Sequence, residues 1–207
     1  EKRCIEYIMG AAMMEPDIRM ETNRLGFCTD HFEMMLGQKN RLSLALMLES
    51  LLGELRKNGY RDILAKAEAK PRKRIGMKTI NDTCFVCSQI EQAMDGMINT
   101  VLRQWAKDES FKTLFSEQQY ICLPHAEKLL TAGHDTLSKK EYPAFKAMVI
   151  SLLDRHLEAV GGDVSHFCRM FDYRNAGPDA DWGNSRDSIE RAILALSTRD
   201  FHTGETD

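Results

Sequence analysis

Cys84-Phe85-Val86-Cys87 and Cys122-Leu123-Pro124-His125 are the two stretches that decide how this chain folds. Each holds two metal-binding side chains separated by two residues. Two such pairs can converge on one tetrahedral ion, and this spacing is typical of structural zinc. The sequence therefore predicts a Cys3His metal site formed by Cys84, Cys87, Cys122 and His125. Its thiolate-rich ligand set favours Zn²⁺ over iron or an iron–sulfur cluster.

The residues around the second pair suit ligands at the start of a helix. Pro124 fits the first helical turn, because its missing N–H would be unpaired there. Cys122 is then expected at the helix N-cap, where the helix dipole favours the metal-binding thiolate. His125 follows three residues later, so both side chains face the same side of that turn. Four protein ligands close the coordination shell, which favours a structural role over a catalytic one.

Composition excludes several classes of protein. The net charge of −3 gives no overall basic field for nucleic acid or a membrane surface. The apolar runs are short and interrupted by charges, so no membrane span is predicted. Six cysteines in a chain rich in Met and Leu favour metal binding in a reducing compartment over disulfides, and hence a cytoplasmic location. The chain opens on Glu1 rather than Met, which indicates a fragment, a processed form or a renumbered chain.

Apolar residues recur at helical spacing along most of the chain, and no convincing strand pattern is present. The predicted fold is therefore all-α. Residues 42–55 are nearly all apolar and are expected to form a buried central helix. Basic residues cluster around Pro71, and we expect Lys70 to Arg74 to be exposed in a linker.

Two stretches of the chain match each other. Phe27-Cys28-Thr29-Asp30-His31 aligns with Ile121-Cys122-Leu123-Pro124-His125, and similar helical patterns surround both. This match predicts a tandem duplication of one helical unit. The predicted organisation is a first unit over 1–58, a basic linker over 59–83, a second unit with the metal site over 84–171, and a loop with a C-terminal helix packing on the units over 172–207.

The first unit carries only half of an obvious metal site. Cys28 and His31 match the second ligand pair, but no Cys-x-x-Cys precedes them in this chain. We expect the missing pair to lie upstream of Glu1. The alternative is a second metal site in which Cys4 joins Cys28 and His31.

These motifs resemble a known family. The tandem cysteine units, the loop Phe171-Asp172-Tyr173-Arg174-Asn175 and the segment Trp182-Gly183-Asn184-Ser185-Arg186-Asp187 are similar to an uncharacterised bacterial family, found mostly in Firmicutes. The family is catalogued only as a domain of unknown function. The resemblance therefore implies a bacterial source and brings no established activity.

Three functions remain open from the sequence. The leading interpretation is a non-enzymatic binding or regulatory module, with a protein partner and no role for a membrane or nucleic acid. The first alternative is a redox or metal sensor, in which oxidation of the thiolates releases zinc. The second is an enzyme with its site in the cleft between units, near the possible ligand loop of Asp172, Tyr173, Arg174 and Asn175. No nucleophile–base pair is evident, which weighs against the enzyme.

Overall fold

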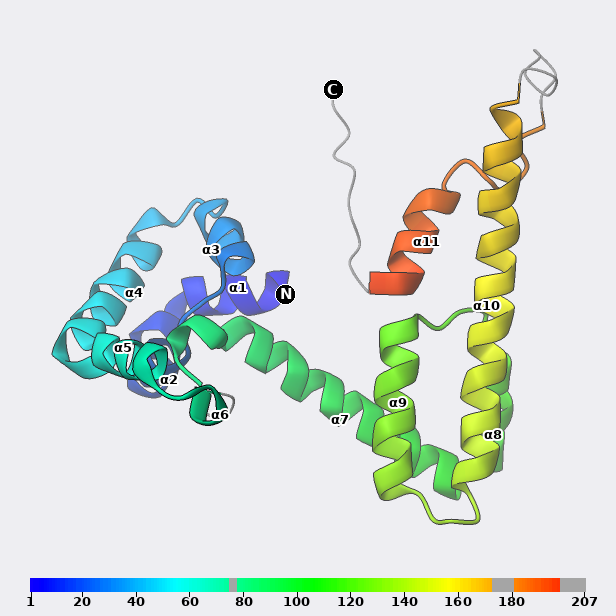
Figure 1. The fold of residues 1–207 in the computed structure, drawn as a ribbon, viewed down its shortest axis with the longest axis horizontal. Helices are drawn as coiled ribbons and strands as arrows, with labels where there is room; N and C mark the ends of the chain where they lie inside the picture. The colour runs from blue at the N-terminus through cyan, green and yellow to red at the C-terminus, as the bar shows by residue number, and fades with distance from the viewer. Residues whose placement is uncertain (75–77, 173–180, 198–207) are drawn as a thin grey trace. The chain divides into compact units, whose positions relative to one another are not determined.

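The structure is a computed structural model, and it describes residues 1–74, 78–172 and 181–197 (Figure 1). All regular structure in these ranges is helical, and none of the described residues lies in a strand. The predicted all-α fold is confirmed. The chain divides into two compact units, Glu1–Asp95 and Gly96–Asp207.

The first unit is a set of short helices. Its elements are α1 (Lys2–Met9), η1 (Ala11–Met14), α2 (Pro16–Leu25), α3 (Thr29–Leu36), α4 (Arg41–Glu54), η2 (Leu55–Gly59), α5 (Tyr60–Glu68), α6 (Pro71–Arg74), η3 (Ile80–Asp82) and the start of α7 (Phe85–Lys107). Local chemistry sets several ends. Pro16 begins α2, where a missing N–H costs nothing. Asn40 caps α4 by accepting from the Ser43 amide, while its own side-chain NH₂ donates to the Met9 carbonyl.

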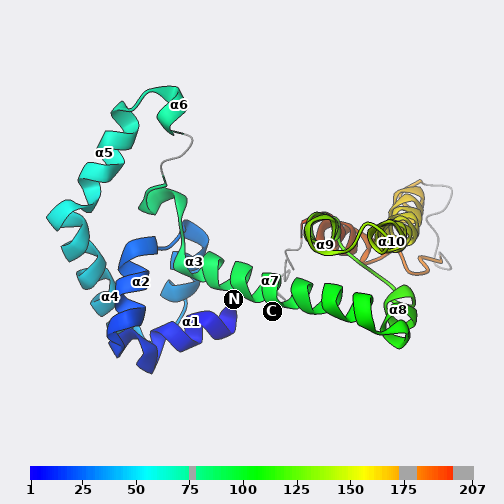
Figure 2. The ribbon, with the colours of Figure 1, turned by 90° about the horizontal axis from the view of Figure 1, so that it is seen from below.

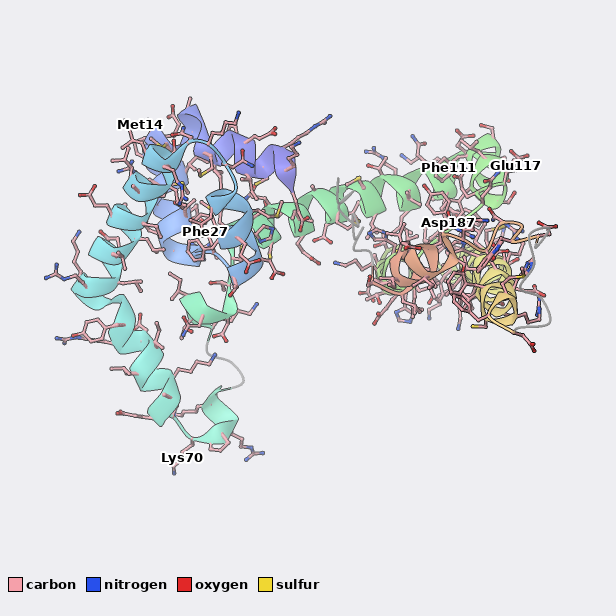
Figure 3. The ribbon with its side chains drawn as sticks, turned by 90° about the horizontal axis from the view of Figure 1, so that it is seen from above. Met14, Phe27, Lys70, Phe111, Glu117 and Asp187 are labelled. Atoms are coloured by element: carbon pink, nitrogen blue, oxygen red, sulfur yellow. The ribbon has the colours of Figure 1, made fainter. Side chains whose placement is uncertain are left out.

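The core of the first unit joins segments that are far apart in the sequence. Ile5, Ile8 and Val86 are fully buried in it. The Phe27 ring lies 5.5 Å from that of Phe32 and 6.5 Å from that of Phe85. Figure 3 shows Phe27 among the helices of this unit. The start of α7 is thereby packed against α1 and the residues that lead into α3.

Helix α4 of the first unit is less buried than predicted. The helix α4 exists, but Leu42 and Leu52 are 68% and 57% exposed, so it is not buried on all sides. Its buried face consists of Ser43, Leu44, Met47 and Leu51. The stretch 59–83 contains α5, α6 and η3, and the boundary between the compact units follows Asp95; the linker role of 59–83 stays a prediction. Lys70 is exposed, as expected of the basic cluster (Figure 3).

The second unit is built from longer helices. It contains the end of α7, α8 (Glu109–Ser116), α9 (Leu123–Thr136), α10 (Tyr142–Met170) and α11 (Ser188–Ser197). Helices α9 and α10 lie side by side, and Figure 2 views both nearly along their axes. Trp105, Phe115 and Phe145 form the aromatic centre of the core, with the Trp105 and Phe145 rings 5.2 Å apart. The tandem duplication of the two units stays a prediction.

A helix that crosses a bilayer needs about 20 consecutive, mostly apolar residues. Within the three described ranges, no helix combines sufficient length with sufficient apolar character to cross a membrane.

Candidate metal centre

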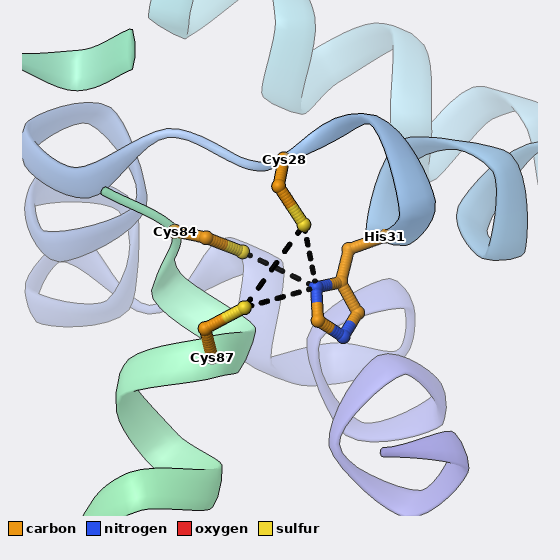
Figure 4. A group of neighbouring side chains, drawn as sticks. All are labelled: Cys28, His31, Cys84 and Cys87. Atoms are coloured by element: carbon orange, nitrogen blue, oxygen red, sulfur yellow. Dashed lines mark hydrogen bonds between the residues drawn. The ribbon is translucent and has the colours of Figure 1, made fainter. Parts of the chain in front are cut away.

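Four metal-binding side chains meet in the first unit. Cys28, His31, Cys84 and Cys87 each direct one ligand atom toward a common point, and these atoms lie within 4.8 Å of one another (Figure 4). His31 Nδ1 is 3.0 Å from Cys28 Sγ, 3.3 Å from Cys84 Sγ and 3.5 Å from Cys87 Sγ. The Cys28 and Cys87 sulfurs are 4.0 Å apart. The group is a Cys3His ligand set.

These separations can be compared with the edges of a tetrahedral zinc site. Zinc–sulfur bonds of about 2.3 Å and zinc–nitrogen bonds of about 2.0–2.1 Å imply sulfur–sulfur edges of about 3.8 Å and sulfur–nitrogen edges of about 3.6 Å. The separation of the Cys28 and Cys87 sulfurs, 4.0 Å, is close to the first edge. The distance from Cys87 Sγ to His31 Nδ1, 3.5 Å, matches the second, and Cys28 lies closer at 3.0 Å. The four atoms therefore fit one tetrahedral ion with small adjustments.

The four ligands lie at the N-terminal ends of two helices, α3 and α7. Cys28 is the N-cap of α3, and His31 lies in its first turn. Cys84 immediately precedes α7, and Cys87 lies in the first turn of that helix. The positive ends of both helix dipoles thus face the sulfurs, and this favours the thiolate form that binds metal.

Direct hydrogen bonds hold these two helix starts together. The Thr83 hydroxyl donates to the Leu25 carbonyl at 2.8 Å. The Phe85 amide donates to the Gly26 carbonyl, also at 2.8 Å. Both bonds join the residues just before Cys28 to the residues on either side of Cys84. These two bonds place the ligand pairs beside each other, and a bound ion would add a further link between the two helix starts.

Gly26 is required at this junction by its backbone conformation and by the space around it. Its φ is +59°, a backbone value that residues with a side chain rarely adopt, and an added Cβ would clash with Ile80 Cγ1. We expect Gly26→Ala to lower the free energy of unfolding by about 1–3 kcal/mol, a typical cost of such strain. The substitution should also weaken metal binding, because the backbone that leads from Gly26 to Cys28 must shift. Chemical denaturation and metal titration measure the two effects.

Gly96→Ala is the matched control. Gly96 lies inside α7, and an added Cβ there meets no other atom within 4 Å. Alanine is the better helix former, so this change should raise stability by about 0.5–1 kcal/mol. Equal losses of stability from the two alanines would contradict the role given to Gly26.

The histidine of the group has the surroundings expected of a metal ligand. His31 is only 3% exposed, and its Nδ1 faces the sulfurs. Its other nitrogen, Nε2, is buried, has no hydrogen-bond partner in the described part of the chain and lies 3.5 Å from the Glu1 carboxylate. Metal-binding histidines commonly direct their second N–H to a carboxylate. Glu1 makes no hydrogen bond with Nε2, but its negative charge lies beside that nitrogen and favours a proton there. The lone pair of Nδ1 is then left to bind a metal.

The three thiols differ in their exposure. Cys84 is buried, Cys28 is half-buried and Cys87 is exposed. Desolvation first, and then hydrogen bonding to Cys84, raise the pKa of Cys87 to about 12. A bound divalent cation would lower the pKa of this thiol, because it stabilises the thiolate directly. Cys84 and Cys87 also line a cavity of about 810 Å³, which gives small molecules access to the sulfurs.

A family model described as "Family of unknown function (DUF6062)" matches residues 1–202. The chain belongs to this family. The match agrees with the resemblance seen in the sequence, since both lead to a family without an assigned function. No curated protein and no solved structure matches the chain. The site must therefore be interpreted from its own chemistry.

The structure groups the ligands differently from the sequence analysis. Cys84 and Cys87 meet Cys28 and His31, whereas the predicted partners were Cys122 and His125. Spacing alone does not choose between the two pairs, because Cys28-x-x-His31 and Cys122-x-x-His125 each have two residues between their ligands. One local expectation is confirmed, since Cys122 is the N-cap of α9.

The remaining predicted site residues lie elsewhere. Cys4, proposed as a third ligand beside Cys28, packs against the core of the first unit and is not one of the four grouped ligands. Burial raises the pKa of its thiol. Asp172 follows the end of α10, with its amide donating to the Arg169 carbonyl. The rest of the possible ligand loop, Tyr173, Arg174 and Asn175, lies outside the described residues.

Proposed function

We propose that this protein is a zinc-binding helical module without enzymatic activity, in which one Zn²⁺ held by Cys28, His31, Cys84 and Cys87 fixes the starts of α3 and α7 to each other. The observation that carries the proposal is the convergence of four ligand atoms within 4.8 Å. Three thiolates and one imidazole favour zinc over harder cations. Because four protein ligands complete a tetrahedron, no position remains for a substrate, and this supports a structural ion.

A binding role is supported by the surface of α11. Ile189, Ile193 and Leu196 are 44%, 38% and 59% exposed, and their spacing places them along one side of the helix. Such a stripe supports a protein partner that covers it with apolar side chains. The zinc-stabilised first unit and this stripe together favour a binding or regulatory module.

The test is metal content per chain. We expect Cys84→Ser to carry one zinc ion fewer than the unchanged protein and to unfold more easily. Cys84 is buried in the core as well as ligating, so Cys87→Ser, at an exposed position, separates ligand loss from packing loss and should lose the same ion. Cys168→Ser, also at an exposed cysteine, is the control and should keep full metal content. Unchanged zinc in both Cys84→Ser and Cys87→Ser would overturn the proposal.

A redox sensor is the second candidate, favoured by the exposure of Cys87. Its sulfur lies 4.0 Å from that of Cys28, and it lines the 810 Å³ cavity. Hydrogen peroxide would oxidise these two thiolates to a disulfide: the O–O bond breaks, the sulfurs lose two electrons, two protons are consumed and two waters form. Zinc would be left with two protein ligands and be released. Release by peroxide that a thiol reductant reverses would support the sensor over the purely structural role.

A further inference from the structure

The Cys-x-x-His pair at the start of α9 has the same local geometry as the pair in the metal centre. Cys122 Sγ lies 3.0 Å from His125 Nδ1, which equals the distance between Cys28 Sγ and His31 Nδ1. Both cysteines are helix N-caps with extended backbone, φ −76° and ψ 166° at Cys28 against φ −83° and ψ 154° at Cys122. The second pair is therefore arranged as half of a metal site.

A cavity in the second unit brings a third ligand toward this pair. The cavity has a volume of about 440 Å³, and Cys122, His125 and His156 all line it. The rest of its wall is formed by Tyr120, Ile121, Arg191, Leu194 and Ala195. One thiol and two imidazoles thus open into a single space with a largely apolar wall. All three are groups that bind zinc and neighbouring transition metals.

The His156 side chain has room to approach the pair. His156 lies on α10, is half-buried, and has its ring 6.0 Å from the Tyr120 ring. Among the described residues it has no hydrogen-bond partner that fixes its ring. The three ligand atoms do not lie within the 4.8 Å spacing of the first centre, so a side-chain rotation is needed. The cavity of about 440 Å³ offers space for that rotation.

We propose that Cys122, His125 and His156 bind a second metal ion, separate from the one in the first unit, with a fourth position open to a small ligand in the cavity. Three protein ligands with one open position are typical of zinc sites that exchange ligands. One thiolate and two neutral imidazoles leave a divalent ion with a net positive charge. The open position therefore favours an anionic head group, and Ile121, Leu194 and Ala195 favour an apolar body on the same molecule.

Cobalt titration of the full chain tests this site. With metal removed, we expect two equivalents of Co²⁺ to bind and to give two charge-transfer spectra, one of three thiolates and one of a single thiolate. Cys122→Ser and His156→Ala should each lose the second equivalent and keep the first. Loss of an outer-shell partner alone costs about 10–100-fold in affinity, so removal of a ligand should weaken the second binding by at least about 100-fold.

His134→Ala is the matched control, because His134 is an exposed histidine that also lies on α9. It should keep both equivalents, and circular dichroism should show each variant to be folded. A single equivalent in the unchanged protein, or two in His156→Ala, would overturn the second site. Complete loss of cobalt in Cys122→Ser would also overturn it, because Cys122 would then belong with Cys84 and Cys87. Cys84→Ser should lose only the three-thiolate spectrum, so failure of the first centre is visible separately.

Discussion

Cys28→Ser is expected to lower the free energy of unfolding of the zinc-loaded protein by more than about 3 kcal/mol. Cys28 contributes one of the four ligands that meet in the first unit. Metal binding supplies folding free energy, because the unfolded chain does not present the ligands together. Loss of this ligand should leave a weak three-ligand site and release the start of α3 from the start of α7.

Denaturation with and without a chelator measures this effect. The unchanged protein should lose stability when zinc is removed, whereas Cys28→Ser should already be destabilised and respond little. Cys168→Ser is the control, since Cys168 is exposed and outside the ligand group. It should change stability by less than about 0.5 kcal/mol, as is usual for surface substitutions.

Comparison of Cys28→Ser with Cys122→Ser decides between the two ligand sets. The group in the structure predicts that Cys28→Ser releases the zinc ion bound by Cys84 and Cys87, while Cys122→Ser leaves it in place. The set of Cys84, Cys87, Cys122 and His125 predicts the reverse order. Native mass spectrometry counts the bound ions directly. Retention of that ion in Cys28→Ser together with its loss in Cys122→Ser would refute the centre described above.

The sequence predicted correctly the features that depend on a single helix or a single ligand pair. Helical periodicity led to the all-α fold, and the Cys-x-x-Cys and Cys-x-x-His spacings identified the residues able to bind metal. Pro124 placed Cys122 at the N-cap of α9, as the structure has it. These features depend on residues within one or two turns of each other, so they leave a readable pattern in the sequence.

Contacts between segments far apart in the sequence could not be predicted from such local patterns. Cys84 and Cys87 meet Cys28 and His31 because Thr83 and Phe85 bond to the carbonyls of Leu25 and Gly26. Hydrogen bonds of this kind, from one hydroxyl and one backbone amide, leave no recognisable motif in the sequence. Nearness along the chain was also a poor guide to which ligand pair joins Cys84 and Cys87. The pair Cys122 and His125 is nearer in sequence, but α7, with 23 residues and a length of about 34 Å, lies between it and Cys84.

The helix α4 shows a related difficulty. Its run of leucines and methionine predicted a buried central helix, yet Leu42 and Leu52 are largely exposed. Apolar composition favours burial but does not show which neighbours are available to cover each face. The packing of α4 onto α2 and α3 supplies cover for one face only.

Phe145→Ala is expected to destabilise the second unit by about 3–5 kcal/mol, the usual cost of removing a buried aromatic ring. Phe145 is fully buried, and its ring lies 5.2 Å from Trp105 and 6.1 Å from Phe115. It also covers Gly133, where an added Cβ would lie 2.9 Å from the Phe145 ring. The alanine would leave a cavity beside Trp105, Phe115 and Gly133.

Two measurements on the same sample separate this effect from the metal centre. In a Trp182→Phe background, where Trp105 is the sole tryptophan, its fluorescence should report an earlier unfolding transition in Phe145→Ala, because the Trp105 ring packs directly on Phe145. Zinc binding by the first unit should be unchanged, since none of its four ligands lies in the second unit. Leu114→Ala, at a 57% exposed position on α8, is the control and should shift the transition little. Loss of zinc from Phe145→Ala at the same denaturant concentration as loss of the Trp105 signal would show that the two compact units unfold together, and would contradict the expected separation.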